Sequence, residues 1–227
     1  MLSIIIPTLN EAQRLLYLLQ FLQNNPQIEV IVVDGGSVDN TVAIAQQYAN
    51  VVLQTEAGRA RQMNQGADIA QGNALWFLHA DTILPVDAIK TLCKALKHHA
   101  WGRFDVTLSG EQPLLKVVSF MINKRSCLTQ IATGDQGLFV KRDLFNSVGG
   151  FLDIPLMEDI ELSSKLKRQA PMYCLPLRLI TSSRRWQKNG IIKTIVTMWC
   201  LRLAYALGVS PQYLHRIYYK PLKNENL

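Results

Sequence analysis

The stretch EVIVVDGGSVDNT, residues 29–41, joins a buried strand to a glycine turn and the start of a helix. Residues 30–33 are all apolar and β-branched, which is typical of a strand covered on both faces. Gly35 and Gly36 let the backbone approach a ligand closely, and the free amides of the first helical turn attract negative charge. We therefore predict a strand-turn-helix unit that binds a ligand at its turn, although the spacing matches neither GxGxxG nor a P-loop.

Short apolar runs alternate with helical patterns on both sides of this unit. The first half has further strand-like runs at 2–6, 50–54 and 73–78, and helical spacing at 11–23, 39–48, 58–70 and 85–98. The second half is less regular, with strands expected at 103–109, 137–141 and 172–180 and a long helix at 114–131. This alternation predicts an α/β fold with a mostly parallel central sheet flanked by helices, and Pro7 is expected to end the first strand.

Polar residues follow the ends of the predicted strands, where ligands of parallel sheets collect. Thr8, Asn10 and Glu11 follow the first strand, and residues 34–37 and 79–82 follow two others. Asp34 has no obvious capping role, so we expect its carboxylate to accept hydrogen bonds from a nucleobase or a ribose hydroxyl. Asp39 is expected instead to cap the following helix.

His79 and Asp81 lie two residues apart after a strand, so their side chains should point the same way. Asp81 is a suitable ligand for Mg²⁺ or Mn²⁺ bridging two phosphates, because hard cations prefer oxygen. The alternative is that Asp81 only forms a turn or a helix cap before Pro85. We favour the metal site because the pair lies at the predicted ligand-binding edge.

Arg59, Arg61 and Asn64 lie in the first turns of a predicted helix. A guanidinium gains nothing from the dipole at a helix N-terminus. Arg59 or Arg61 is therefore expected to hold a phosphate or a carboxylate such as Asp34, unless both arginines are simply solvated.

Glu158 and Asp159 open another predicted helix. Two adjacent carboxylates raise each other's pKa, which suits a general base, but they could also merely complement the helix N-terminus. Glu161 is expected to pair with Lys165 on the surface.

Two more polar segments are candidates for substrate contacts. The glycine-flanked turn of Gly134, Asp135 and Gln136 is either a simple loop or an acceptor-side wall. Arg184 and Arg185 offer cationic contacts to a diphosphate, and Trp186 offers an aromatic face to a sugar or a base.

Composition describes a globular chain of 227 residues, with 48% hydrophobic and 18% charged residues and a net charge of +7. This charge favours anionic lipid or a phosphorylated substrate, because no nucleic-acid motif is present. The four cysteines form no CxxC pair, so we expect small buried thiols in a reducing compartment. The apolar N-terminal run lacks the basic residues and cleavage site of a signal peptide.

Residues 191–207 form the most apolar long segment and include Lys193 and Arg202. A spanning helix needs about 20 apolar residues, so this segment is too short and charged for that role. We expect a helix packed on the domain, with a helix at the membrane surface as the alternative.

The order of these motifs resembles that of family 2 glycosyltransferases with the GT-A fold. The resemblance covers residues 2–186 and includes SIIIPTLNE at 3–11, residues 33–41, the His79–Asp81 segment and the Glu158–Asp159 pair. The narrower resemblance is to the arsenosugar-biosynthesis-type subfamily. It rests on GRARQMN at 58–64, LHADT at 78–82, GDQG at 134–137, SRRW at 183–186 and LGVSP at 207–211.

The resemblance implies roles for individual residues. Asp34 would bind the nucleobase or ribose, Asp81 would be the metal-binding aspartate of a DxD-type motif, and Asp159 would deprotonate the acceptor hydroxyl for inverting transfer. His79 stands where the first acid of DxD is expected. The SRRW segment is similar to the QxxRW element without its glutamine, which argues against processive polymerisation.

We therefore predict a cytoplasmic glycosyltransferase that uses a nucleotide-diphospho-sugar donor and Mg²⁺ or Mn²⁺. Residues 1–186 would form the GT-A domain and 187–227 a helical extension, packed on the domain or at the cytoplasmic face of the membrane. A small-molecule or lipid-linked acceptor is compatible with the sequence. The alternatives are a nucleotidyltransferase, which usually needs a glycine-rich, lysine-bearing loop that residues 7–11 lack, or a non-catalytic nucleotide-binding protein.

Overall fold

The computed structural model describes residues 1–23 and 25–219. The strands are β1 Leu2–Thr8, β2 Ile28–Asp34, β3 Val51–Gln54, β4 Ala74–Phe77, β5 Trp101–Leu108, β6 Phe139–Lys141 and β7 Tyr173–Thr181. The helices are α1 Ala12–Leu22, α2 Thr41–Tyr48, α3 Arg59–Ile69, α4 Ala88–Ala95, α5 Pro113–Thr129, α6 Arg142–Ser147, α7 Glu158–Gln169, α8 Arg184–Asn189, α9 Ile191–Ala206 and α10 Pro211–Tyr218. A 3-10 turn spans Gly134–Gln136.

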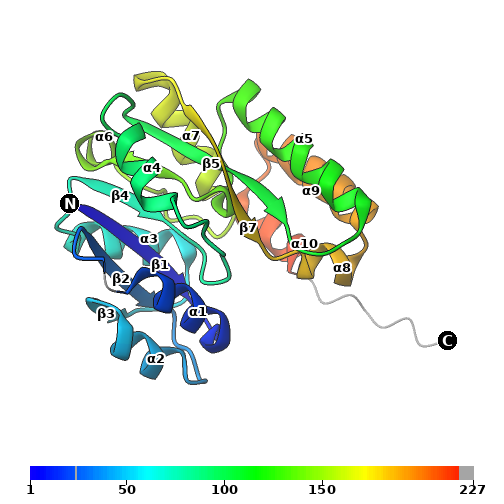
Figure 1. Ribbon diagram of the computed structural model, residues 1–227. Helices are drawn as coiled ribbons and strands as arrows, with labels where there is room; N and C mark the ends of the chain where they lie inside the picture. The colour runs from blue at the N-terminus through cyan, green and yellow to red at the C-terminus, as the bar shows by residue number, and fades with distance from the viewer. Residues whose placement is uncertain (24, 220–227) are drawn as a thin grey trace.

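These strands form one seven-stranded sheet in the order β3-β2-β1-β4-β6-β5-β7, with helices on both faces (Figure 1). Strand β6 runs antiparallel to its neighbours β4 and β5, whereas the other neighbouring pairs are parallel. The predicted α/β fold with a mostly parallel sheet is confirmed.

The two faces of the sheet carry separate hydrophobic cores, because alternate residues of a strand point to opposite sides. Ile4 and Ile6 of β1 pack with helices α1 and α4 on one face. Ile5 packs with Met63 of α3 and Leu162 of α7 on the other face. This double covering explains why the first strands are continuous apolar runs rather than alternating ones.

Strand β1 continues to Thr8, so the expectation that Pro7 ends it is wrong. The pairing of β1 with β4 reaches only Ile5, opposite Phe77. The missing N–H of Pro7 therefore falls beyond that pairing, where a proline is tolerated.

The helices that follow β7 pack against α5 and against the start of α7 (Figure 1). Ile191 and Ile195 of α9 pack against Leu115 of α5. Leu201 of α9 and Leu214 of α10 share a second cluster with Met157. Residues 220–227 of the predicted C-terminal extension lie outside the described residues.

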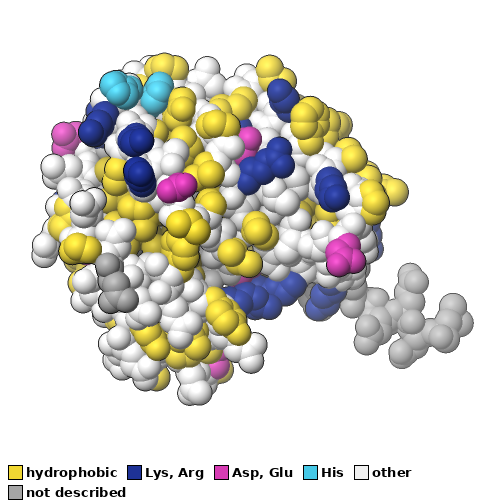
Figure 2. Space-filling view, viewed as in Figure 1, with side chains coloured by type: hydrophobic (Ala, Val, Ile, Leu, Met, Phe, Trp, Pro, Cys, Tyr) yellow, Lys and Arg dark blue, Asp and Glu magenta, His cyan; other side chains and the backbone are white. Residues whose placement is uncertain are grey.

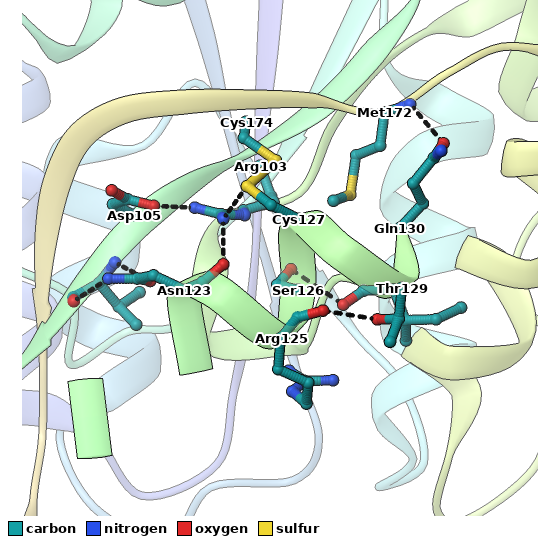
Figure 3. The surroundings of a disulfide bond; sticks show 12 residues. Arg103, Asp105, Asn123, Arg125, Ser126, Cys127, Thr129, Gln130, Met172 and Cys174 are labelled. Atoms are coloured by element: carbon teal, nitrogen blue, oxygen red, sulfur yellow. Dashed lines mark hydrogen bonds and ion pairs between the residues drawn. A yellow bond between two sulfur atoms is a disulfide. The ribbon is translucent and has the colours of Figure 1, made fainter. Parts of the chain in front are cut away.

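Figure 3 shows a disulfide between Cys127 of α5 and Cys174 of β7. The expectation of four unpaired, buried thiols is wrong, since these two cysteines are bonded and Cys200 is exposed. The cysteines therefore no longer support the prediction of a reducing compartment. A separation of 47 residues gives no signal of pairing in the sequence, because folding alone brings α5 against β7.

Candidate active site

The carboxyl ends of β1, β2 and β4 lie at one edge of the sheet, because these strands are parallel neighbours. Thr8 and Asp34 end β1 and β2 opposite one another, and His79 and Asp81 follow β4. In Figure 2, basic side chains gather in the hollow where α8 faces the region around α1. The structure therefore brings the predicted polar segments to one edge.

Asp34 is fully buried, and its carboxylate binds its own loop. Oδ2 accepts hydrogen bonds from the amides of Gly36 at 2.9 Å and Ser37 at 2.8 Å, and Oδ1 accepts from Thr8 Oγ1 at 3.2 Å. The argument that Asp34 lacks a capping role is therefore wrong, because it closes the glycine turn. Contact between a nucleoside and Asp34, Thr8 or Gly35 stays a prediction.

Neighbouring side chains fix the position of this turn. Gln62 of α3 donates to the carbonyls of Thr8 at 2.9 Å and Val33 at 2.8 Å. Asn10 adopts a left-handed φ of 54° and accepts from the Val38 amide at 2.9 Å. These contacts hold the ends of β1 and β2 at a fixed spacing from α3.

Asp39 contacts the start of α2 as expected. Its Oδ1 accepts from the Thr41 amide at 3.0 Å, although Asn40 occupies the N-cap position.

Arg184, the first residue of α8, bridges two carboxylates of the rim. Its Nη2 donates to Glu11 Oε1 and to Asp81 Oδ2, each at 3.2 Å. The sequence separation from Asp81 is 103 residues, so the fold alone makes this pairing. Asp81, Glu11 and Arg184 thus form one charged cluster at the predicted diphosphate position.

The chemistry of this cluster fits a Mg²⁺ or Mn²⁺ ion shared with a substrate. Among residues 1–23 and 25–219, no group of three or more His, Cys, Asp or Glu side chains is arranged to hold a metal ion alone. Ions of this kind usually bind through one or two carboxylates, water and substrate phosphates. Asp81, whose side chain is 18% exposed, supplies such a carboxylate.

Arg59, at the start of α3, connects the strand edge to α7. Its Nη2 lies 3.1 Å from His79 Nδ1, and its Nη1 lies 3.6 Å from Glu158 Oε1. The expected arginine–carboxylate pair is therefore present, but the carboxylate is Glu158 rather than Asp34. Burial, together with the Arg59 charge, holds the pKa of His79 well below its ordinary value, so the ring is neutral at pH 7.

The acceptor-side turn lies directly against this group. Asp159 Oδ2 accepts from the Gly134 amide at 2.9 Å. A Cβ atom added to Gly134 would lie 2.9 Å from His79 Nε2 and 3.2 Å from Arg59 Nη2, so the turn contacts both side chains. Gly134 thus joins the segment that carries Asp81 to the segment that carries Asp159.

Carboxylates of this turn and of α7 are held in partly desolvated surroundings. Burial raises the pKa of Glu158, and the adjacent Asp159 raises it further. Burial also raises the pKa of Asp135. The mutual effect expected for two adjacent carboxylates is therefore present at Glu158, but burial is its larger cause.

Four predicted site residues make their contacts elsewhere. Arg61 pairs with Glu56 and Asp153 on the surface, and Asn64 exchanges hydrogen bonds with the backbone of Phe151. Arg185 lies 3.4 Å from the ring centre of Tyr218, and Trp186 packs in the cluster around Leu115. Sequence alone could not orient these side chains, because each has at least one partner that is distant in the chain.

Gln62, Arg125 and Arg202 are additional residues at or near the site that sequence reasoning did not select. Gln62 lies one position from Arg61, on the buried face of α3. The two arginines lie on largely apolar helices and belong to no recognisable motif.

A strand edge that presents carboxylates beside arginines defines an α/β protein suited to a phosphorylated ligand. The particular family follows from its sequence: the chain belongs to glycosyl transferase family 2, whose family model matches residues 3–140. A 4,4'-diaponeurosporenoate glycosyltransferase of Staphylococcus aureus is 35% identical over 133 residues, which is 55% of this chain and 33% of the relative. The chain thus spans about a third of the length of that relative.

Solved structures of glycosyltransferases have the same GT-A fold. TarS from S. aureus, in complex with UDP-GlcNAc, matches 81% of this chain and 58% of its own, with a TM-score of 0.63 and 21% identity. The mannosyltransferase PcManGT from Pyrobaculum calidifontis, in complex with GDP-Man and Mn²⁺, matches 96% of this chain and 70% of its own, with a TM-score of 0.63 and 20% identity. The arsenosugar-type subfamily stays a prediction, because the family model covers the whole family.

Proposed function

We propose that the protein transfers a sugar from a nucleotide-diphosphate donor to an acceptor hydroxyl. The observation that carries this proposal is that Gly134 contacts both Asp159 and the Arg59–His79 pair. His79 lies two residues before Asp81, so this contact links the two carboxylates. A carboxylate suited to a diphosphate-bound ion and a carboxylate suited to deprotonating a hydroxyl then belong to one site. Family membership supports this assignment.

The residues divide into a donor side and an acceptor side. Asp81 would hold Mg²⁺ or Mn²⁺, which supplies positive charge against the charge developing on the leaving diphosphate. Arg184 and Arg59, with side chains 51% and 41% exposed, would direct the N–H groups not used by their present partners toward phosphate oxygens. Asp159 would accept the proton of the acceptor hydroxyl as the new glycosidic bond forms and the bond to the diphosphate breaks.

A donor screen tests this proposal. The melting temperature of the protein is measured with UDP-, GDP- and dTDP-sugars, with and without Mn²⁺. One donor class is expected to raise it in the presence of metal, because a ligand at 100 times its Kd adds about 2.7 kcal/mol of stability. Turnover of that donor separates a transferase from a non-catalytic nucleotide-binding protein. Failure of every donor to stabilise the protein would contradict the proposal.

We further propose that the acceptor reaches the enzyme at a membrane surface. In the described part of the chain, no helix is long and apolar enough to cross a bilayer. Helix α9 nevertheless exposes a stripe of apolar residues. The adjacent α5 exposes a second stripe, on the side of the molecule seen in Figure 2. They are Ile192, Val196, Trp199 and Leu203 on α9, and Val117, Phe120 and Met121 on α5.

Exposed Lys116, Lys124 and Lys193 flank these stripes, which suits an anionic leaflet. We expect the protein to co-sediment with vesicles of phosphatidylcholine containing phosphatidylglycerol. Trp199→Ser should weaken vesicle binding about tenfold, because the variant has no indole to bury in the bilayer. Tyr17→Ser, which removes an exposed aromatic residue of α1, serves as the matched control. Equal binding by both variants would contradict the assignment of this face.

A further inference from the structure

Two arginines from different helices approach the acceptor side without a bound partner. Arg125 lies on α5 and Arg202 on α9, and both are half-buried. Figure 3 shows the Arg125 side chain extending away from Arg103 and the disulfide. Neither guanidinium forms an ion pair within residues 1–23 and 25–219.

Contacts of adjacent residues attach the helices that carry both arginines to segments beside the acceptor-side turn. Ser126, next to Arg125, donates to the Ile131 carbonyl at 2.9 Å, just before that turn. Leu201, next to Arg202, packs with Met157 at the start of α7. Tyr205 of α9 also donates to Glu161 of α7 at 3.2 Å. Helices α5 and α9 are therefore attached to the segments that hold Asp135 and Asp159.

The positive charges of Arg125 and Arg202 favour the binding of an anion beside the acceptor-side turn. Burial and the charge of Arg202 lower the pKa of Arg125 to about 10, and burial also lowers the pKa of Arg202. Arginine side chains in proteins stay protonated at neutral pH. The carboxylates of Asp135 and Asp159 act on both arginines through space, without the close pairing that would occupy their N–H groups. Protonated donors that lack close partners in partly buried surroundings are costly, and an anion would relieve that cost.

Gln136 adds another donor to the same turn. Its side chain is fully buried, and its Oε1 accepts from the Thr133 amide at 3.0 Å. Its Nε2 has no hydrogen-bond partner among the described residues. Buried amide donors are normally paired, so this orphan donor marks the turn as a place where a hydrogen bond is left unmade.

We propose that Arg125 and Arg202 bind a phosphate or carboxylate group of the acceptor, which places the acceptor hydroxyl at Asp159. This inference rests on the proposed transferase function. Guanidinium groups bind such anions through two parallel hydrogen bonds, which fixes orientation as well as affinity. The carboxylates that act on both arginines are Asp135 and Asp159 of the acceptor side rather than Asp81, so the donor diphosphate is not the expected occupant.

Binding of small anionic probes to the full chain tests the proposal. The probes are inorganic phosphate and glycerol 3-phosphate, with glycerol as the neutral counterpart. Their binding is measured by calorimetry, once with the protein alone and once with Mn²⁺ and the best donor nucleotide. Arg125→Gln and Arg202→Gln are each expected to weaken glycerol 3-phosphate binding at least tenfold, because each loses a charge-assisted contact. Arg168→Gln, which removes an exposed charge near the end of α7, is the matched control and should bind like the wild type.

Two outcomes would overturn the proposal: equal binding of glycerol and glycerol 3-phosphate, or unchanged binding in both arginine variants. Arg125→Lys replaces Arg125→Gln if the latter fails to fold. Vesicles containing phosphatidylglycerol distinguish the source of the anion: arginine-dependent binding to vesicles indicates a lipid headgroup, and binding confined to the soluble probes indicates a free phosphate ester. Loss of all donor binding would refute the transferase function alone, because the anion probes report on the arginines independently.

Discussion

Replacement of Asp159 by asparagine is expected to lower kcat for sugar transfer by about 10²- to 10⁴-fold, which is the usual contribution of a general base. Asparagine retains an oxygen that can accept from the Gly134 amide, at 2.9 Å in the wild type, so the acceptor-side turn should keep its position. Donor affinity should therefore change little. Steady-state transfer rates and donor binding by thermal shift measure the two effects separately.

Glu158→Gln is the matched comparison, because the two carboxylates are adjacent but differ in surroundings. Glu158 is buried and paired with Arg59, whereas Asp159 is half-buried and bound to a turn. We expect Glu158→Gln to lower the melting temperature and to spare more of kcat. If Glu158→Gln abolishes transfer and Asp159→Asn does not, the proton acceptor is Glu158.

The strand edge was predictable because its geometry depends on local signals. Each of the first strands is a continuous apolar run, and each ends in polar residues. Parallel neighbours must place those ends together. Thr8, Asp34 and Asp81 could therefore be assigned to one edge from the sequence alone, and the resemblance to a known family added their expected roles.

The contacts within that edge were less predictable. The role of Asp34 in closing its own turn depends on the conformation of Gly36, which has a φ of 91° and directs its amide to the carboxylate. A carboxylate at the end of a strand therefore looks available for a ligand in the sequence, even when the amides of its own loop already donate hydrogen bonds to it.

The second half of the site depends on contacts across long separations. Arg184 contacts Asp81 because α8 directly follows β7 and begins beside the strand edge. The neighbouring Arg185 packs instead on the ring of Tyr218 of α10. Three consecutive residues of one motif thus have three different surroundings, since Trp186 joins a hydrophobic cluster. Helical geometry separates them by about 100° each, so a motif on a short helix cannot act as one unit.

Replacement of Asp81 by asparagine is expected to abolish the stimulation of donor binding and transfer by Mn²⁺. An amide lacks the negative charge that a hard cation needs, and the effect on kcat/KM should be at least about 10²-fold, as expected when several kcal/mol of charge stabilisation is lost. Transfer rates titrated with Mn²⁺ in the wild type and the variant measure this loss. Asp87→Asn, which removes an exposed carboxylate six residues away, is the control and should titrate normally.

Arg184 makes this experiment decisive, because it supplies a positive charge that could replace a metal. In the structure its guanidinium lies 3.2 Å from Asp81, where it would itself contact a diphosphate. If the enzyme relies on Arg184 instead of a metal ion, wild-type transfer will be insensitive to chelation. Arg184→Gln will then be more damaging than Asp81→Asn. The metal-dependent mechanism requires the opposite order, with Arg184→Gln mainly raising the donor KM and leaving the Mn²⁺ response intact.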